Sequence, residues 1–300
     1  SYILRKKLIQ AFPSSFFNEK GCRLSELELA HFLKNADAAV VGIEPVTDQV
    51  LIKNPKLKMI SKYGVGLDNI DQELLKYRGI KLGWTGGVNR RSVAELTLCF
   101  MLGLCRNVFS SGFKLKQFEW EKDGGHQLSD KTVGIIGCGH IGSDVVRLLL
   151  PFRCNLLVRD IVDKSNFCQE QGILEVSLEE IIERSDIISL HVPFTALTYK
   201  MVNENFLKRM NSASFLINTS RGKVVNQEAL KIALMQGDIN GAALDVFAEE
   251  PPIDKDFLSL PNLMVTPHIG GNAIEGVEAM GRAAIQHLVL FFENSLKDKI

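Results

Sequence analysis

A glycine-rich turn at residues 137–142 has the residue types and the spacing to bind a dinucleotide. In the motif Gly-Cys-Gly-His-Ile-Gly, Gly137 permits a tight turn, Gly139 lets a pyrophosphate approach the backbone, and Gly142 lets a helix pack closely on the preceding strand. That helix would also offer free N–H groups and the positive end of its dipole to the phosphates. A glycine turn alone is weak support, because such turns also serve as plain strand–helix connections.

A carboxylate stands where a dinucleotide site needs one. The expected strand at residues 155–158 is followed by Asp160, which can accept a hydrogen bond from the 2′-hydroxyl of the adenosine ribose. The same charge repels a 2′-phosphate, so the sequence favours NAD over NADP. Arg159 keeps NADP open as the alternative cofactor, because an arginine can pair with that phosphate.

Three further loops follow expected strands and carry side chains suited to acid–base chemistry. Their sequences are Asn-Thr-Ser-Arg-Gly at residues 218–222, Asp-Val-Phe-Ala-Glu-Glu-Pro-Pro at 245–252, and Thr-Pro-His-Ile-Gly-Gly at 266–271. Because ligands of open α/β sheets bind beyond the carboxyl ends of the strands, Arg221, Glu250 and His268 can converge on one cleft. Each also has a structural interpretation, which is a surface ion pair for the arginine, a solvated turn for the glutamate and a structural role for the histidine.

The elements that would position these loops alternate between short apolar strands and longer helical patterns. Strands are expected at residues 38–41, 59–61, 80–82, 133–136, 155–158, 187–190, 215–218, 242–245 and 264–266. Helical patterns lie between most of them, and two long ones are expected at 92–111 and 272–293. Nearly continuous apolar strands that alternate with helices predict an α/β fold with parallel sheets covered on both faces. Residues 1–12 are helix-like with no strand before them, which we interpret as a truncated or unseen start.

The bulk composition narrows the classes of protein. The 300 residues are 46% hydrophobic and 23% charged, which is typical of soluble globular proteins and excludes disordered and fibrous chains. Lys+Arg and Asp+Glu both number 35, so no nucleic-acid partner is indicated. The six cysteines are scattered without a CxxC pair, so we expect a reduced cytoplasmic chain with no metal site. No signal peptide or bilayer-spanning run is evident, so no membrane partner is expected.

The loop motifs, taken in order, resemble those of the D-isomer-specific 2-hydroxyacid dehydrogenase family. TSRG, DVFAEEPP and PHIGG follow GCGHIG, and YGVGLDNID at residues 63–71 and NRRSVAE at 89–95 extend the resemblance over nearly the whole chain. The resemblance implies two Rossmann-like, doubly wound domains with the active site in the cleft between them. The flavodoxin-like substrate domain would comprise residues 1–85 and 272–300, and the NAD-binding Rossmann domain would be inserted at 86–271.

The resemblance implies an NAD-dependent hydride transfer to or from C2 of a D-2-hydroxy acid. His268 would take the hydroxyl proton in oxidation and return it to the carbonyl oxygen in reduction, which suits a group whose ordinary pKa lies near neutrality. Glu250 would hydrogen-bond the far ring nitrogen, which selects the tautomer and favours the imidazolium. Arg221 would grip the substrate carboxylate or polarise the carbonyl oxygen with its forked guanidinium.

The resemblance also assigns the binding residues. On the adenosine and pyrophosphate side of the cofactor it implies His140, Ile141, Asp160, Val192 and Pro193. Along the nicotinamide half it implies Thr219, Ser220, Arg221, Asp245 and His268, although Asp245 can also be interpreted as a plain strand terminus. On the substrate side, the backbone of Val65 and Gly66 would receive the carboxylate, because glycine permits close approach.

The expected substrate is 3-phosphoglycerate, because VGLDNID and AEEPP look most like the phosphoglycerate dehydrogenase branch and Lys62 can pair with a phosphate. Glu44 would instead repel a phosphate, so glyoxylate, hydroxypyruvate or another 2-keto acid is the alternative substrate. An NAD(H)-sensing, corepressor-like scaffold is the alternative of another class. Family members are commonly dimers through the nucleotide domain, so a homodimer is expected, embraced by the polar segment that contains Trp120.

Overall fold

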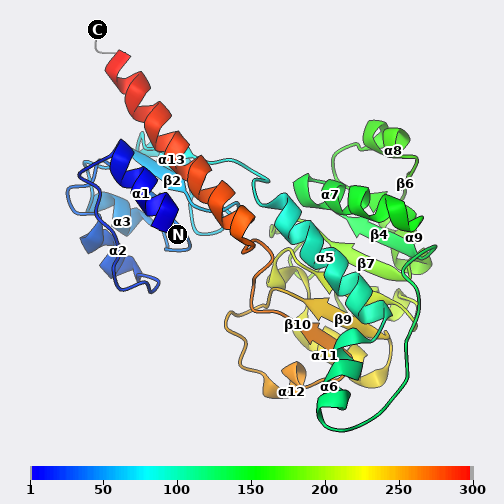
Figure 1. The fold of residues 1–300 in the computed structure, drawn as a ribbon. Helices are drawn as coiled ribbons and strands as arrows, with labels where there is room; N and C mark the ends of the chain where they lie inside the picture. Colours follow the sequence, from blue (N-terminus) through cyan, green and yellow to red (C-terminus); the bar gives the residue numbers. More distant parts are fainter. Residues whose placement is uncertain (1, 298–300) are drawn as a thin grey trace. The chain divides into compact units, whose positions relative to one another are not determined.

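The computed structural model describes residues 2–297 and separates them into two compact units (Figure 1). We call residues 90–272 the central unit, and residues 2–89 together with 273–297 the split unit. The chain thus leaves the split unit once, builds the central unit without interruption, and returns to the split unit for its last helix.

Within residues 90–272, seven strands form one sheet in the order β10-β9-β8-β7-β4-β5-β6, and every neighbouring pair is parallel. Their bounds are β4 Thr132–Ile136, β5 Asn155–Arg159, β6 Leu174–Glu175, β7 Ile187–Leu190, β8 Phe215–Asn218, β9 Gly241–Leu244 and β10 Leu263–Val265. The chain starts in the middle at β4, runs outward through β5 and β6, and then returns to the other side of β4 for β7. The carboxyl ends of β4 and β7 therefore flank the switch point at which doubly wound sheets bind ligands.

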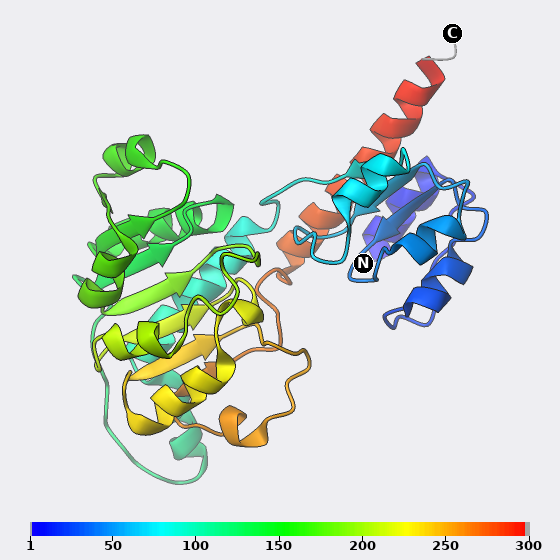
Figure 2. The same ribbon diagram turned by 180° about the vertical axis from the view of Figure 1, so that it is seen from behind.

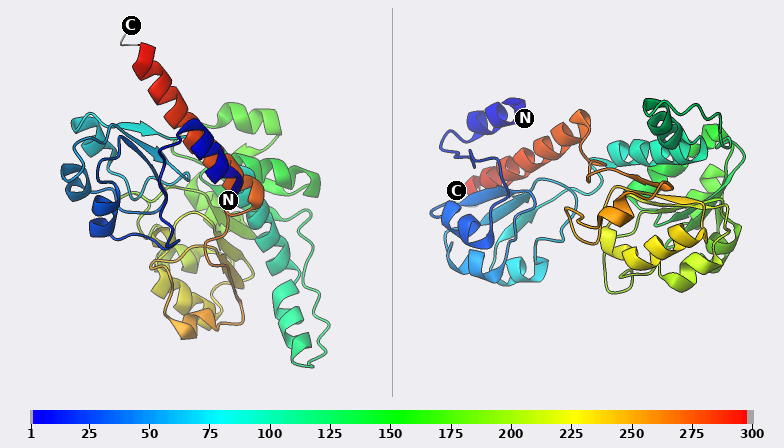
Figure 3. Two further views of the ribbon diagram at one scale, coloured as in Figure 1. Left: turned by 60° about the vertical axis from the view of Figure 1, so that its left-hand side comes forward. Right: turned by 90° about the horizontal axis from the view of Figure 1, so that it is seen from below.

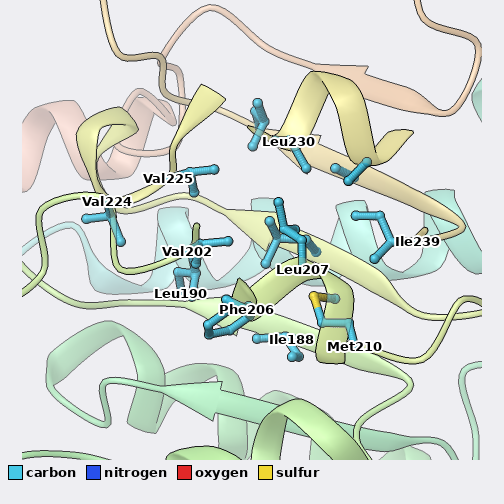
Figure 4. Close-up of a cluster of buried hydrophobic side chains, with 14 of the residues drawn as sticks. Ile188, Leu190, Val202, Phe206, Leu207, Met210, Val224, Val225, Leu230 and Ile239 are labelled. Atoms are coloured by element: carbon cyan, nitrogen blue, oxygen red, sulfur yellow. The ribbon is translucent and has the colours of Figure 1, made fainter. Parts of the chain in front are cut away.

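Helices cover both faces of this sheet, as Figure 2 shows from behind. Their bounds are α5 Arg90–Cys105, α7 His140–Leu149, α8 Ser165–Gln171, α9 Leu178–Arg184, α10 Glu204–Arg209, α11 Gln227–Gln236 and α12 Lys255–Leu258, with 3-10 turns at Leu150–Phe152 and Gly222–Val224. Because side chains alternate along a strand, Ile187 joins the apolar cluster shared with α5 and α7, while Ile188 joins the opposite cluster shared with α9 to α11 (Figure 4). All of β7 is buried, which explains why the strands are apolar at successive positions.

The predicted single helix over residues 92–111 is wrong. The chain forms α5 and then a second helix, α6 Val108–Lys116, and the two helices are bent by 65°. The break falls at Asn107, whose φ of 52° lies in the left-handed region that an α-helix does not contain. Among residues 2–297, no single helix is long and apolar enough to cross a bilayer, and only the bent α5–α6 pair meets that test of length and composition.

Helix α6 begins a surface segment, residues 108–127, which we call the arm. The arm leaves the end of α5 and returns to it, since the backbone N–H of His126 donates to the carbonyl oxygen of Cys105 at 2.7 Å. A Cβ at Gly125 would lie 2.1 Å from the same oxygen, so only glycine fits the return. Unlike α5, helix α6 buries no residue.

Within residues 2–89, three parallel strands form a smaller sheet in the order β1-β2-β3. The elements of the split unit are α1 Tyr2–Ala11, α2 Glu26–Phe32, β1 Ala38–Val41, α3 Asp48–Ile52, β2 Met59–Lys62, α4 Gln72–Tyr77, β3 Lys81–Gly83 and α13 Ile274–Lys297. Residues 2–37 thus contain two helices and no strand before β1.

The two faces of the small sheet are covered by different helices. On one face α13 packs on β2, where the Ser61 hydroxyl donates to the carbonyl oxygen of Ala284 at 2.8 Å. Helix α1 lies alongside α13 (Figure 3). On the other face an apolar cluster that includes Ile60 is shared with α2, α3 and α4. The sheet places the loop after β2 at its carboxyl edge.

Candidate active site

The glycine-rich turn connects β4 to α7 at the switch point of the central sheet. Gly137 has a φ of 93°, and a Cβ there would lie 2.6 Å from the carbonyl oxygen of His191. A Cβ at Gly142 would lie 2.0 Å from the carbonyl oxygen of Gly137, so helix and turn pack backbone to backbone. A Cβ at Gly139 would meet no atom of residues 2–297 within 4 Å, and no side chain caps α7. The turn therefore offers room and free N–H groups to a pyrophosphate.

Asp160 follows β5 and is tied to the glycine-rich turn. Its Oδ2 accepts from the backbone N–H of Cys138 at 2.7 Å, and its Oδ1 accepts from the N–H of Val162 at 3.0 Å. Each carboxylate oxygen keeps a second lone pair that can accept from a ribose hydroxyl. The room at the turn, the uncapped helix and this carboxylate together fit a dinucleotide.

The remaining residues predicted for the adenosine and pyrophosphate side lie around the same turn. His140 is the exposed first residue of α7, and Ile141 packs against the apolar cluster beneath that helix. A Cβ at Gly137 would lie 2.9 Å from Val192 Cγ1, so the loop after β7 borders the turn. Pro193 is in that loop, where its carbonyl oxygen accepts from the Thr198 hydroxyl at 2.7 Å.

The thiol inside the turn is not a reactive group. All six cysteines of the sequence are free thiols, and Cys138 is buried. Burial raises the pKa of Cys138 to about 12, so the thiolate that would react is scarce at neutral pH. Chemistry at this edge of the sheet has to come from the other loops.

His268 and Glu250 meet although eighteen positions separate them. His268 Nδ1 lies 2.7 Å from Glu250 Oε2. The other carboxylate oxygen, Glu250 Oε1, accepts from the backbone N–H of Phe247 at 3.1 Å, which orients the carboxylate. Because Nδ1 faces the glutamate, Nε2 is the ring nitrogen available for proton transfer to another group.

Arg221 is carried by a loop that packs on the loop of Glu250. A Cβ at Gly222 would lie 1.9 Å from the carbonyl carbon and oxygen of Phe247, so the two loops touch backbone to backbone and only glycine fits. Arg221 Nη1 donates to the carbonyl oxygen of Ser220 at 2.7 Å, so the guanidinium lies beside the backbone of its own loop.

Asn218, at the end of β8, organises the loop that carries Arg221. Its buried Oδ1 accepts from the backbone N–H of Ser220 at 3.0 Å and from the Ser220 hydroxyl at 2.7 Å, and its Nδ2 donates to the carbonyl oxygen of Arg221 at 2.9 Å. The hydroxyl of Thr219 lies 3.0 Å from that of Thr97 on α5. Thr219 and Ser220 are therefore buried structural members of the loop as well as predicted cofactor contacts.

Asp245 holds the loop of His268 in place. Its Oδ1 accepts from the Thr266 hydroxyl at 2.6 Å and from the N–H of Ile269 at 2.7 Å, and its Oδ2 accepts from the N–H of Gly270 at 2.8 Å. The carboxylate is 1% exposed, and the Asp245 carbonyl oxygen also accepts from the N–H of His268. The histidine is thereby kept at a φ of 54°, which a non-glycine residue adopts only when its surroundings hold it there.

The charges of His268, Glu250 and Arg221 affect the pKa values of the histidine and the glutamate. The hydrogen bond to Glu250 raises the pKa of His268 above its ordinary value; burial and the charge of Arg221 oppose this effect, and Asp245 supports it. Burial alone would raise the pKa of Glu250, but the hydrogen bonds from His268 and Phe247 and the charge of Arg221 lower it overall. Glu250 is therefore favoured as a carboxylate, and the imidazole of His268 beside it binds its proton more tightly than usual.

In the split unit, Lys62 ends β2 and is 6% exposed. Its ammonium donates to the carbonyl oxygen of Gly42 and, at 2.7 Å, to Asn69 Oδ1. Glu44 joins the same group, because its Oε2 accepts from the N–H of Gly42 at 3.0 Å and its carbonyl oxygen accepts from Asn69 Nδ2 at 2.6 Å. Lys62 thus connects the loops that follow β1 and β2.

Val65 and Gly66 lie in the loop after β2, where both are partly buried. Among residues 2–297, no acceptor pairs with the backbone N–H of either residue. These two donors are the ones predicted to receive a carboxylate.

Sequence reasoning missed the two asparagines that organise these loops. Asn218 is the last residue of β8, directly before the loop of Arg221. A polar residue at the end of an otherwise apolar strand could have indicated its role. Asn69 bonds partners from the loop after β1 and from Lys62, so no local pattern identifies it.

Comparisons with known proteins bear on both units. Residues 98–270 match the NAD binding domain of the D-isomer specific 2-hydroxyacid dehydrogenases. A glyoxylate reductase from Korarchaeum cryptofilum is 36% identical over 267 residues, which are 86% of this chain and 80% of that protein. A D-3-phosphoglycerate dehydrogenase from Methanocaldococcus jannaschii is 35% identical over 281 residues, which are 92% of this chain and 54% of that longer protein. The structure of D-lactate dehydrogenase from Aquifex aeolicus, in complex with NAD and lactic acid, superposes with a TM-score of 0.84 at 29% identity, covering 97% of this chain and 93% of that one.

These matches agree with the fold and with the fit of the glycine-rich turn to a dinucleotide. The matched domain spans more than half of the chain and lies inside the central unit. The expected family, the α/β fold with parallel doubly wound sheets and the NAD cofactor are therefore confirmed. The chain is an enzyme that acts on CH–OH groups with NAD and belongs to the D-isomer-specific 2-hydroxyacid dehydrogenase family.

Proposed function

We propose that this enzyme interconverts a small 2-keto acid and its D-2-hydroxy acid, with glyoxylate and hydroxypyruvate as the favoured keto acids. The observation that carries the proposal is the pairing of His268 Nδ1 with Glu250 Oε2 at 2.7 Å, under the charge of Arg221. In this proposal the central unit is the NAD-binding domain and the split unit is the substrate domain, and the predicted cofactor and substrate residues act in those roles.

His268 is the proposed acid and base. When bound, NAD(H) supplies or accepts the hydride at C2 of the substrate. In reduction, Nε2 of the imidazolium donates a proton to the carbonyl oxygen, and in oxidation neutral Nε2 takes the proton from the hydroxyl. Glu250 keeps the other ring proton on Nδ1 in both directions and stabilises the imidazolium, and its own pKa is held low so that it stays a carboxylate.

Arg221 is the proposed electrophilic partner. Its guanidinium is always charged and presents several N–H donors in one plane, so it can bind the substrate carboxylate and polarise the carbonyl oxygen as negative charge develops there. The contact of its loop with the loop of Glu250 at Gly222 sets the guanidinium close enough to affect both titrating groups. The backbone N–H groups of Val65 and Gly66 receive the carboxylate in the substrate domain.

The choice of a small keto acid follows from the surroundings of Lys62. Its ammonium already donates to the carbonyl oxygen of Gly42 and to Asn69 Oδ1, and the Glu44 carboxylate accepts from the N–H of the same Gly42. A phosphate at this place would compete with those bonds and meet a negative charge. The likeness to a glyoxylate reductase over 80% of that protein's length supports the same choice.

The second candidate substrate is 3-phosphoglycerate. The likeness to a D-3-phosphoglycerate dehydrogenase covers 92% of this chain, and it favours this substrate although only 54% of that protein is matched. If Lys62 did pair with the phosphate, its removal would raise KM for phosphorylated substrates selectively.

A panel of 2-keto acids tests the proposal by consumption of NADH. We expect kcat/KM for glyoxylate or hydroxypyruvate to exceed that for phosphohydroxypyruvate by about tenfold or more. In a Lys62→Met variant, KM for phosphorylated and unphosphorylated substrates should change alike. The reverse preference in the parent would support the second candidate. Turnover of no keto acid in the panel would contradict the proposed reaction and favour a nucleotide-sensing scaffold.

We also propose that two copies of the chain form a dimer through the central unit. Helix α6 buries no residue, and Phe113, Phe118 and Trp120 in the arm are 65%, 97% and 74% exposed. Large aromatic side chains clustered on a surface segment are typical of a contact with another protein.

In the cytoplasm, where we expect the enzyme, the free thiols stay reduced.

The mass in solution tests the dimer. The parent should have twice the chain mass of 33.4 kDa by light scattering, and a Phe118→Asp/Trp120→Asp variant should have the mass of one chain. Tyr77→Asp is the matched control, because Tyr77 is 86% exposed on the split unit and should leave the mass unchanged. A parent of single-chain mass would contradict the proposal.

A further inference from the structure

Trp84 makes a hydrogen bond that burial of its side chain does not explain. It follows β3, and its indole Nε1–H donates to the carbonyl oxygen of Val65 at 3.0 Å, across nineteen positions of the chain. The side chain is 42% exposed, so it contributes little to the apolar cluster of the split unit. Its ring nitrogen instead contacts the loop after β2.

The bond has a direct consequence for the next peptide group. The Val65–Gly66 peptide is trans, so its C=O and N–H point in opposite directions within one plane. An indole that holds the Val65 carbonyl oxygen therefore turns the N–H of Gly66 to the other side of the loop. That N–H has no acceptor among residues 2–297, and an unpaired backbone donor at a loop is available to an anion.

The start of the same loop is anchored independently. The Tyr63 hydroxyl donates to the carbonyl oxygen of Val277 on α13 at 3.2 Å. Gly64 has a φ of 121°, which side-chain-bearing residues rarely adopt, so the chain turns sharply between Tyr63 and Val65. The plane of the Val65–Gly66 peptide beyond that turn is held by Trp84.

We propose that Trp84 is a positioning residue for the substrate carboxylate. Its indole N–H fixes the Val65 carbonyl, and this orients the N–H of Gly66 toward the carboxylate of the 2-keto acid before the substrate arrives. The inference rests on the proposed function, in which this loop receives the carboxylate. A donor that is oriented in advance needs no ordering on binding, so its loss should weaken substrate binding and leave the hydride transfer itself intact.

The kinetic test compares Trp84→Phe with Thr85→Val. The first keeps an aromatic ring and removes only the N–H. The second removes the neighbouring hydroxyl, which lies 2.8 Å from His287 Nε2. For Trp84→Phe we expect KM for the keto acid to rise roughly 2- to 10-fold, the range of one ordinary hydrogen bond, with kcat and KM for NADH within about twofold of the parent. Thr85→Val should leave all three parameters unchanged.

Two kinetic results would overturn the proposal. An unchanged keto-acid KM in Trp84→Phe would show that the bond does not position the loop for substrate. A rise in both KM values together with a lowered Tm would show a general structural role instead.

A second measurement does not depend on turnover. In the ¹⁵N-labelled protein, the Trp84 indole N–H, assigned by its loss in Trp84→Phe, should exchange with solvent more slowly than that of Trp120, which is 74% exposed. Oxamate, added with NADH as a carboxylate probe, should shift the Gly66 amide resonance at lower concentration in the parent than in Trp84→Phe. Equal exchange of the two indoles, or equal oxamate titrations, would contradict the role of Trp84 even if the parent reduces no keto acid. Failure of turnover alone would count against the proposed function only.

Discussion

In the central unit, glycines pressed against neighbouring backbone help to hold the functional loops, together with the side chains of Asn218 and Asp245. In the split unit, the loops after β1 and β2 are connected by side chains. A Cβ at Gly142 or Gly222 would lie 2.0 or 1.9 Å from backbone atoms. A Cβ at Gly42 would lie 3.5 Å from a Glu44 oxygen, an ordinary contact, and the Lys62 ammonium ties the loops together instead.

This difference has a physical basis in what each unit is proposed to bind. A pyrophosphate needs to approach the backbone closely, which glycine allows, and the loops of Arg221 and Glu250 meet backbone to backbone at Gly222. A loop held by a buried cation, an amide and an indole can be altered by single substitutions. We therefore infer that the split unit is the part in which substrate choice can change, and the predictions below test this contrast between the units.

The largest expected effect is on the proton-transfer residue of the central unit. His268→Ala should lower kcat by about two to four orders of magnitude, because the acid and base is lost, while the affinity for NADH stays near that of the parent. Turnover and NADH binding by fluorescence measure the two effects separately. His31→Ala, an exposed histidine on α2 of the split unit, is the control and should be unchanged. A His268→Ala variant that worked at the parent rate would contradict the assignment of the three catalytic residues.

Two glycine-to-alanine substitutions, one in each unit, test whether close backbone packing at glycine distinguishes the units. Gly142→Ala should lower the free energy of unfolding by about 1–3 kcal/mol or more, because the new Cβ meets the Gly137 carbonyl oxygen. Gly42→Ala should change it by less than about 1 kcal/mol, because its nearest neighbour lies at ordinary contact distance. Denaturant unfolding of both variants gives the comparison, and equal losses would remove the distinction between the two units.

The polar network of the split unit is tested by a pair of lysines. Lys62→Met should cost about 1–3 kcal/mol of unfolding free energy, because buried acceptors lose a charged donor. Lys58→Met removes an ion pair to Asp37 in which both side chains are more than half exposed, and it should cost less than about 1 kcal/mol. Should the two variants prove equally stable, the side-chain network would not be what holds this unit's loops.

The smallest effect is expected on cofactor choice. Asp160→Ala should reduce the preference for NAD over NADP by about tenfold, equal to about 1.4 kcal/mol, because the repulsion of the 2′-phosphate is lost. The ratio of kcat/KM for NADH and NADPH measures it. Arg159→Ala is the companion variant. If it weakened NADPH use in the parent background, Arg159 would be the residue that meets the phosphate.

The same contrast explains how far the sequence could predict the molecule. The ranges of β1, β7 and β8 coincide with those expected, because each is a short, mostly apolar run bounded by polar residues or glycine. Glycine motifs are recognisable because the residue type and its spacing are themselves the structural requirement. The two-residue strand β6 was missed because so short a run carries no period.

The failures have tertiary causes. The helix predicted over residues 92–111 was wrong because the left-handed backbone at Asn107 is not a property of its apolar neighbours. The contacts of Lys62 and Trp84 were not predicted because their partners come from other loops. The roles of the individual site residues and the limits of the two domains stay predictions.

The pH dependence of kcat/KM for keto-acid reduction, in the parent and in Glu250→Gln, is the most direct test of the histidine–glutamate pair. Reduction needs protonated His268, so the rate should be high at low pH and fall as pH rises through the pKa of that histidine. Because Glu250 raises this pKa, the parent should lose activity above the ordinary value of 6.5, and Glu250→Gln should lose it at lower pH. Superimposable profiles for the two proteins would contradict the coupling of the glutamate to the histidine.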